Sequence, residues 1–159
     1  MKRISTTETS AVASQNRSSF RLALPLTRGQ DSRTSHNKKI NEPHVSKVSR
    51  NTILPESWGS DCSAWRLLAQ PDLAVAEEVM PPGTTEKRHI HHRARQFFYV
   101  LSGTLSMERE GSATVALGPG EGLEMPPNVA HRAHNAGGET VRFLVISAPT
   151  TKGDRVDLE

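Results

Sequence analysis

From Trp65 onward, the chain consists of short β-branched or alternating runs that are separated at close intervals by glycine and proline. Such runs and turn residues predict strands and tight turns. The predicted strands are residues 73–80, 86–92, 96–101, 103–109, 113–117, 122–125, 131–135 and 140–147, and no convincing amphipathic helix lies between them. Many short strands without intervening helices indicate an all-β sandwich or barrel rather than a parallel α/β sheet.

Residues 1–50 differ in composition from the rest of the chain. They hold ten basic and three acidic residues and are rich in serine and threonine, so the overall net charge of +3 hides a negatively charged remainder. Their one local apolar patch, residues 20–26, is interrupted by Arg21 and Pro25 and is too small to form a core. We therefore predict a disordered, low-complexity basic extension over residues 1–50 and a single domain over residues 51–159.

Sharper interpretations of this extension have weaknesses. A transit peptide fits its Arg- and Ser-rich, acid-poor composition. A nucleic-acid-binding arm lacks interleaved aromatic residues, and a secretory signal would need an apolar run longer and nearer the start than residues 20–26. No stretch approaches the roughly 18 apolar residues that cross a bilayer. We expect a cytoplasmic protein that binds neither nucleic acid nor membrane.

Histidines mark the candidate functional site. His89 and His91 are two residues apart in a predicted strand, so both imidazoles project from one face of the sheet. The next strand can return Gln96 to the same lining, and His131 adds a third imidazole. Three neutral imidazoles and one side-chain oxygen can bind a divalent transition metal and leave positions open for substrate. A His-x-His pair alone is most often found in surface or packing roles, so its surroundings decide.

Both histidine segments have the spacing of known family motifs. Residues 83–103 follow the pattern Gly, five residues, His-x-His, four residues, Glu, six residues, Gly, with Gln96 at the Glu position. Residues 120–135 follow the pattern Gly, five residues, Pro-x-Gly, two residues, His, three residues, Asn, with Asn128 at the second Gly position. The chain thus resembles the cupin superfamily, in its small single-domain type, over most of residues 65–149.

The resemblance implies a fold, a site and an assembly. The fold is a double-stranded β-helix, the cupin jelly-roll barrel, and the assembly is a homodimer. His89, His91, His131 and the residue at position 96 would meet at one metal site near the barrel interior. The ion would be a divalent transition metal, either iron, nickel, manganese, zinc or copper. Its identity is left open.

Two residues depart from the motifs. Asn128 replaces a glycine, and asparagine is the non-glycine residue that most readily adopts a left-handed backbone, so we expect the turn to survive. Gln96 replaces a carboxylate with a neutral, weaker oxygen donor. We therefore expect weaker metal binding and a stronger Lewis acid, similar to the three-histidine site of cysteine-dioxygenase-like cupins. The position also loses a candidate general base. Whether Gln96 contacts the ion is left undecided by the sequence.

Neighbouring residues have expected positions as well. His92 and His134 are at odd spacing from the proposed ligands and should face away from the site. Phe98 and Val100 share the face of Gln96 and could form an apolar pocket wall or simply barrel core. Three arginines have two possible roles that the sequence leaves open: they bind an anionic substrate, or they prevent a sheet edge from pairing with another strand. They are Arg66, Arg93 and Arg95.

Three functions compete on these residues, and no catalytic residue can be named. The first is a metal-dependent dioxygenase or related oxidoreductase that acts on a small molecule. The second is a non-catalytic module that binds a small polar ligand such as a sugar. The third is a carbohydrate isomerase or epimerase, which the missing Glu at position 96 makes less favourable. Fold alone does not separate them.

Overall fold

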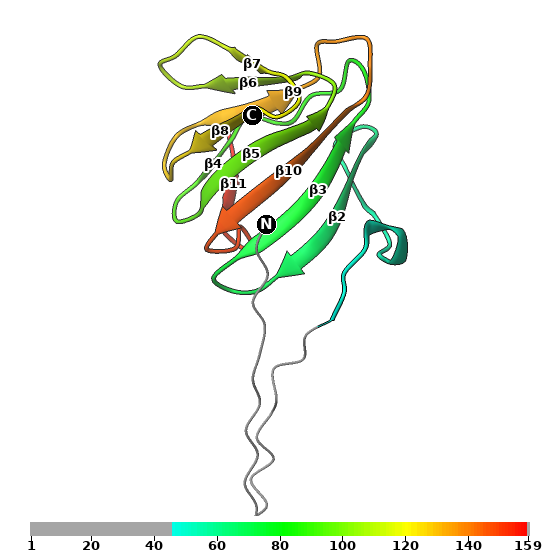
Figure 1. The fold of residues 1–159 in the computed structure, drawn as a ribbon. Helices are drawn as coiled ribbons and strands as arrows, with labels where there is room; N and C mark the ends of the chain where they lie inside the picture. Colours follow the sequence, from blue (N-terminus) through cyan, green and yellow to red (C-terminus); the bar gives the residue numbers. More distant parts are fainter. Residues whose placement is uncertain (1–45, 159) are drawn as a thin grey trace, which may run out of the picture. The chain divides into compact units, whose positions relative to one another are not determined.

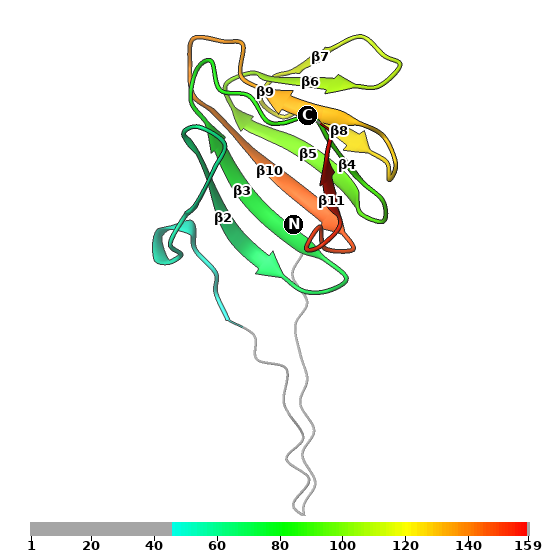
Figure 2. The ribbon, with the colours of Figure 1, turned by 180° about the vertical axis from the view of Figure 1, so that it is seen from behind.

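The computed structural model describes residues 46–158, which form two antiparallel sheets (Figures 1 and 2). Residues 1–45, and with them most of the predicted basic extension, lie outside the described residues. The larger sheet has the spatial order β1 (Glu56–Trp58), β2 (Cys62–Ala69), β3 (Ala74–Met80), β10 (Val141–Ala148), β5 (Arg95–Ser102), β8 (Gly122–Met125). The smaller sheet has the order β11 (Arg155–Asp157), β4 (His89–His91), β9 (His131–His134), β6 (Leu105–Arg109), β7 (Val115–Leu117).

The strand order identifies the predicted double-stranded β-helix. β10, late in the chain, lies between β3 and β5, and β4 lies between β9 and β11 (Figure 1). The chain therefore passes repeatedly between the two sheets. The predicted all-β jelly-roll fold is confirmed. Among residues 46–158, no helix is both long and apolar enough to cross a membrane.

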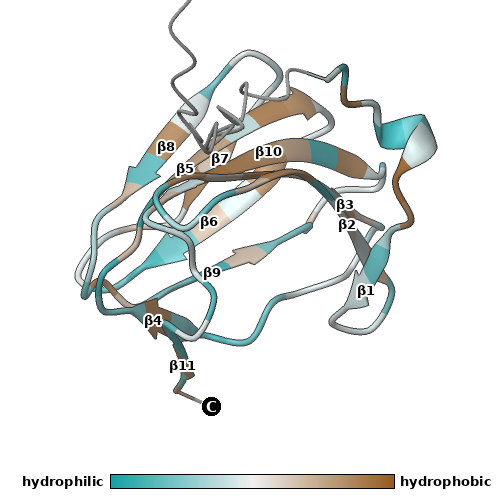
Figure 3. Ribbon diagram, turned by 90° about the horizontal axis from the view of Figure 1, so that it is seen from below, coloured by the Kyte–Doolittle hydropathy of each residue, from teal (hydrophilic) through white to brown (hydrophobic). Residues whose placement is uncertain are grey.

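Strand β5 shows how alternation in the sequence fixes the inside of the barrel. Gln96, Phe98 and Val100 are buried, whereas the residues between them are exposed. Figure 3 shows the mostly hydrophobic stretches of β5, β8 and β10 in brown. The Phe98 ring lies 6.3 Å from the ring of Phe143 on β10, in the core between the sheets. The inward face of β5 thus joins the core at one end to the histidine site at the other.

Strand β10 carries apolar side chains on both of its faces. Its inward residues Val141, Phe143 and Val145 are buried. On the opposite face, Leu144 and Ile146 are half-buried. The outer face of the larger sheet is therefore apolar and partly exposed.

Three positions of the two motifs have a physical explanation in the structure. Gly103 has φ +76°, and a Cβ there would lie 2.8 Å from the Thr140 carbonyl oxygen, so only glycine fits. Asn128 has φ +63°, which confirms the expectation that asparagine accepts the left-handed conformation at this turn. Asn135, the last motif residue, is buried and donates to the carbonyl oxygens of Met80 (2.9 Å) and Glu139 (2.8 Å). These three residues hold the turns that flank the site.

Candidate metal centre

Pairing of β4 with β9 brings the three histidines together. His89 lies directly opposite His131 in this antiparallel pair, and His91 follows on the same face of β4. The ring centroids of His89 and His131 are 4.3 Å apart, and those of His89 and His91 are 5.0 Å apart. One nitrogen of each imidazole lies within 4.8 Å of the others, and all three side chains are buried. Such a cluster could hold one metal ion.

Two of the imidazoles are oriented by backbone carbonyl groups. The Nδ1 atom of His89 lies 3.0 Å from the Lys87 oxygen, and that of His131 lies 2.9 Å from the Val129 oxygen. In the neutral tautomer that donates Nδ1–H to these oxygens, Nε2 keeps a free lone pair. These rings therefore present metal-binding nitrogens to the cluster.

Burial keeps the histidines in the neutral form that a metal requires. Desolvation, followed by the charge of Arg155, lowers the pKa of His89 to about 4. Desolvation and the neighbouring His89 and His131 lower the pKa of His91 to about 4, and burial also lowers the pKa of His131. Near neutral pH the cluster carries no protons that a metal would have to displace.

Gln96 reaches the same cluster. Its Oε1 atom lies 3.0 Å from Nε2 of His131. Because His131 uses its Nδ1–H on the Val129 carbonyl, its Nε2 is an acceptor, and two acceptors facing each other suit a cation between them. Without an ion, the Gln96 amide group can turn its NH2 toward His131. The donor set of three imidazoles and one amide oxygen therefore fits a divalent transition metal.

Asp154, from a distant part of the chain, faces the third histidine, His91. Its Oδ2 atom lies 3.9 Å from Nδ1 of His91, which has no hydrogen-bond partner among residues 46–158. The carboxylate also accepts from the backbone N–H groups of Ala94 (2.8 Å) and Arg93 (3.1 Å). Burial disfavours its ionised form, but these donors outweigh burial and lower the pKa of Asp154 to about 2. An ionised carboxylate thus faces the outer nitrogen of His91.

Substitution Asp154→Asn should weaken metal binding about 10- to 100-fold, because residues that orient a ligand contribute on that scale. The measurement is a titration with Co²⁺, followed by its visible absorption, with circular dichroism to confirm folding. Asp72→Asn, in an exposed turn, is the matched control and should bind normally. Unchanged affinity in a folded Asp154→Asn protein would contradict an orienting role.

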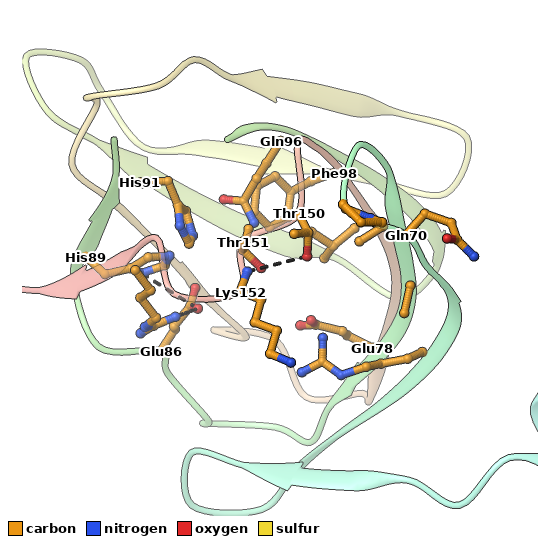
Figure 4. A pocket seen from close by; sticks show the side chains of 16 residues that line it. Gln70, Glu78, Glu86, His89, His91, Gln96, Phe98, Thr150, Thr151 and Lys152 are labelled. Carbon is orange, nitrogen blue, oxygen red and sulfur yellow. Dashed lines mark hydrogen bonds and ion pairs between the residues drawn. The ribbon is translucent and has the colours of Figure 1, made fainter. Parts of the chain in front are cut away.

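A cavity of about 800 Å³ opens beside the histidines (Figure 4). His89, His91, Gln96 and Phe98 line it, whereas Val100 is fully buried in the core and lies outside this lining. His131 is not part of the lining either. The site therefore has an accessible side formed by β4 and β5.

The candidate arginines separate in the structure. Arg66 lines the cavity. Arg93 donates its Nε–H to Asp154 at 3.2 Å, and Arg95 pairs with Glu124. His92 is exposed, as expected, with its Nδ1 3.0 Å from the Asn128 side-chain oxygen. Only Arg66, of these three arginines, is placed to meet a bound molecule.

Four charged lining residues were missed by sequence reasoning: Glu78, Glu86, Lys152 and Arg155. Glu86 lies 3.7 Å from Nδ1 of His89 and pairs with Arg155 at 2.7 Å. Glu78 faces inward from β3, and desolvation together with the nearby Glu86 raises its pKa to about 8. Strand parity could have identified Glu78, since it lies two residues before the buried Met80. The C-terminal residues have no such pattern.

The metal-free protein should be most stable at about pH 7. Below pH 6.5, histidines of the unfolded chain take up protons that folded His89 and His91, with pKa values of about 4, do not, so the unfolding free energy falls. Glu78 acts in the opposite direction, because its pKa is raised from 4.5 to about 8 and the folded chain therefore keeps a proton that the unfolded chain has lost. Its contribution to the unfolding free energy falls between about pH 4.5 and pH 8 and is level above pH 8. Once the histidine contribution is complete near pH 6.5, the net unfolding free energy therefore falls until about pH 8. Urea unfolding in EDTA from pH 5 to pH 9 measures both limbs, and Glu78→Gln should flatten the alkaline one. A steady rise across this range would contradict the assignment of Glu78.

Comparisons with known proteins agree with the geometry. Residues 76–147 match the family model described as "Cupin domain". The chain is 32% identical over 71 residues to a protein named polyketide synthase CurC from Streptomyces cyaneus, a match that covers 45% of this chain and 46% of that protein. The chain thus spans about half the length of this relative.

Solved structures share the fold. KdgF from Halomonas sp. superposes with a TM-score of 0.62 at 20% identity, over 68% of this chain and 98% of that one. The polyketide cyclase RemF from Streptomyces resistomycificus superposes with a TM-score of 0.61 at 22% identity, over 67% and 81% of the two chains. At these identities, the similarity concerns the fold alone.

Proposed function

We propose that this chain, which contains a cupin domain at residues 76–147, binds one divalent transition-metal ion and uses it to transform a small molecule. His89, His91 and His131 would hold the ion, with Gln96 as a fourth, weaker donor. The observation that carries the proposal is the buried cluster of neutral imidazoles, whose nitrogens lie within 4.8 Å of one another beside a cavity of about 800 Å³.

The reaction class that we propose first is that of an oxidoreductase, in particular a dioxygenase. A bound iron, nickel, manganese or copper ion supplies Lewis-acid and redox chemistry. Because all four donors are neutral, none of them offsets the ion's charge. Phe98 lines the cavity beside Gln96 and gives one wall an apolar surface that excludes water. The protein's own residues hold the ion, orient the bound molecule and shield both from water.

Metal analysis of the full chain tests this function. We expect close to one equivalent of iron, nickel, manganese, zinc or copper after purification or reconstitution, and oxygen consumption with a turned-over small molecule. Azide added to Co²⁺-loaded protein should change its visible spectrum if coordination positions face the cavity. Absence of metal after reconstitution with each of these ions would refute the proposal.

Substitution Gln96→Glu should tighten metal binding about tenfold, which corresponds to about 1.4 kcal/mol. A carboxylate at this position, where the native oxygen lies 3.0 Å from Nε2 of His131, adds a negative charge and a stronger oxygen donor. Competition with a fluorescent Zn²⁺ chelator measures the change. Gln70→Glu, at the cavity wall away from the histidines, adds the same charge as a control. Equal affinities for wild type and Gln96→Glu would place the side chain outside the metal's reach.

Glu78 favours a second candidate, a proton-transfer reaction such as isomerisation or ring closure. The residue faces the cavity from β3, and its pKa of about 8 allows it both to give and to take a proton near neutral pH. It offers the titratable group that Gln96 cannot provide. CurC and RemF carry names from polyketide chemistry, in which ring closure also requires proton transfer. Solvent deuterium entering a ligand without oxygen consumption would favour this candidate over the first.

We also propose a homodimer formed through the outer face of the larger sheet. Phe97 and Tyr99 stack there with centroids 6.4 Å apart, and the two side chains are 40% and 36% exposed. Exposed aromatic pairs of this kind are typical of interfaces. Light scattering should give a dimer for wild type and a monomer for Phe97→Glu/Tyr99→Glu. Leu54→Glu, at an exposed position elsewhere, should remain dimeric, and a monomeric wild type would exclude the dimer.

A further inference from the structure

The cavity beside the histidines has an unbalanced charge. Two of its cationic side chains already have carboxylate partners: Arg155 pairs with Glu86 at 2.7 Å, and Arg66 with Glu56 at 2.7 Å. Lys152 also lines the cavity, is exposed, and has no ion-pair partner among residues 46–158. In Figure 4 its side chain extends into the cavity, in the direction of Glu78. One ammonium group is therefore available to a bound molecule.

Lys152 stands on a fixed turn rather than on a loose loop. The backbone N–H of Thr150 donates to the Pro71 oxygen at 3.1 Å, and that of Asp154 donates to the Thr151 oxygen at 3.0 Å. Asp154 in turn accepts from the Ala94 N–H at 2.8 Å. The base of the Lys152 side chain is thus held at the same place relative to His91, which Asp154 also faces.

Neither remaining group in the cavity compensates this charge. Glu78 lines the same cavity with no hydrogen bond or ion pair to any residue in the described part of the chain. Burial and the charge of Glu86 raise its pKa to about 8, so near neutral pH it is mostly protonated and can donate a hydrogen bond. Glu86 is engaged by Arg155, and the histidine and glutamine donors are neutral. The Lys152 ammonium, which is exposed to solvent at the cavity, is therefore open to an anionic group of a bound molecule.

We propose that the cavity binds a small organic dianion, with one carboxylate on the Lys152 ammonium and the other directed at the histidine cluster. Glu78 would donate a hydrogen bond to an oxygen of the bound molecule. The half of the proposal that concerns the histidine cluster rests on the proposed metal function. The contact with Lys152 does not, because it requires only the side chain and the shape of the cavity.

Calorimetric titration of the full chain tests this, with and without Zn²⁺. The probes are malonate, succinate and malate, each compared with its diamide, which has the same shape without the charge. We expect at least one dianion to bind roughly tenfold or more tightly than its diamide, a difference typical of hydrogen bonds to charged groups. In the metal-free protein, Lys152→Met should remove this preference and Lys152→Arg should restore it. Lys47→Met removes the same charge from outside the cavity and should bind like wild type.

The outcomes separate this inference from the proposed function. Diamides that bind as well as the dianions, or a Lys152→Met protein that keeps the full preference, would overturn the inference. Binding of Zn²⁺ with no dianion preference would leave the metal function standing and refute the ligand class. A dianion preference that depends on Lys152 in a protein that takes up no metal would refute the metal function and support the Lys152 contact.

Discussion

The double variant His89→Ala/His131→Ala should lose metal binding altogether, with affinity reduced more than about a thousandfold. Residues that merely orient a metal ligand contribute about 10- to 100-fold to metal affinity. This variant removes two of the three proposed ligands themselves, whose ring centroids lie 4.3 Å apart. One imidazole and one amide oxygen remain. The measurement is metal content after reconstitution, together with the thermal shift that Zn²⁺ causes.

The control for this experiment is His92→Ala. His92 is the immediate neighbour of His91 but is exposed and faces away from the cluster. We expect it to bind one equivalent of metal, and saturating Zn²⁺ should stabilise it as it does wild type, by about 2.7 kcal/mol at one hundred times the dissociation constant. Metal retained by a folded double variant would mean that the ion binds somewhere other than the cluster.

Phe143→Ala should reduce the unfolding free energy by about 3–5 kcal/mol. The side chain is fully buried on β10, which lies between β3 and β5, and its ring meets that of Phe98 at 6.3 Å. Domains of this size are stable by only about 5–15 kcal/mol, so the loss is a large fraction of the total. Urea unfolding measures it.

Leu101→Ala is the matched control for the core substitution. Leu101 lies on β5, next to β10, but is 37% exposed on the outer face. We expect this truncation to reduce the unfolding free energy by less than about 1 kcal/mol in the monomer. A loss below 1.5 kcal/mol for Phe143→Ala would show that the core closes around the missing ring.

Much of the barrel was predictable because strand alternation encodes which face is buried. The runs at residues 73–80, 96–101 and 140–147 coincide closely with β3, β5 and β10. The two-residue spacing of His89 and His91 predicts that both imidazoles lie on one face, and the structure shows that His131, the predicted third imidazole, lies directly opposite His89. Periodicity is a local property, so it is legible without knowing the partner strand.

The parts that could not be predicted depend on contacts between distant segments. β11 (Arg155–Asp157) is only three exposed residues, too short for alternation to predict a strand, and its strand conformation comes with its pairing to β4. Asp154 carries no motif, and its role depends on the turn at Arg93 and Ala94. Lys152 likewise lines the cavity only because the chain after β10 folds back to it. Such pairings are decided by the whole fold, not by the local sequence.

The position of Asp154 has a consequence for how the protein is made. All three histidines and Gln96 precede β10 in the chain, whereas the carboxylate that faces His91 follows it. During synthesis, the imidazoles therefore leave the ribosome well before the segment that aligns one of them and fixes the Lys152 turn. A nascent chain stalled after β10 would contain every candidate ligand but would lack the Asp154 carboxylate that faces His91. We therefore expect a chain that ends between β10 and Asp154 to bind metal more weakly than a chain that includes Asp154.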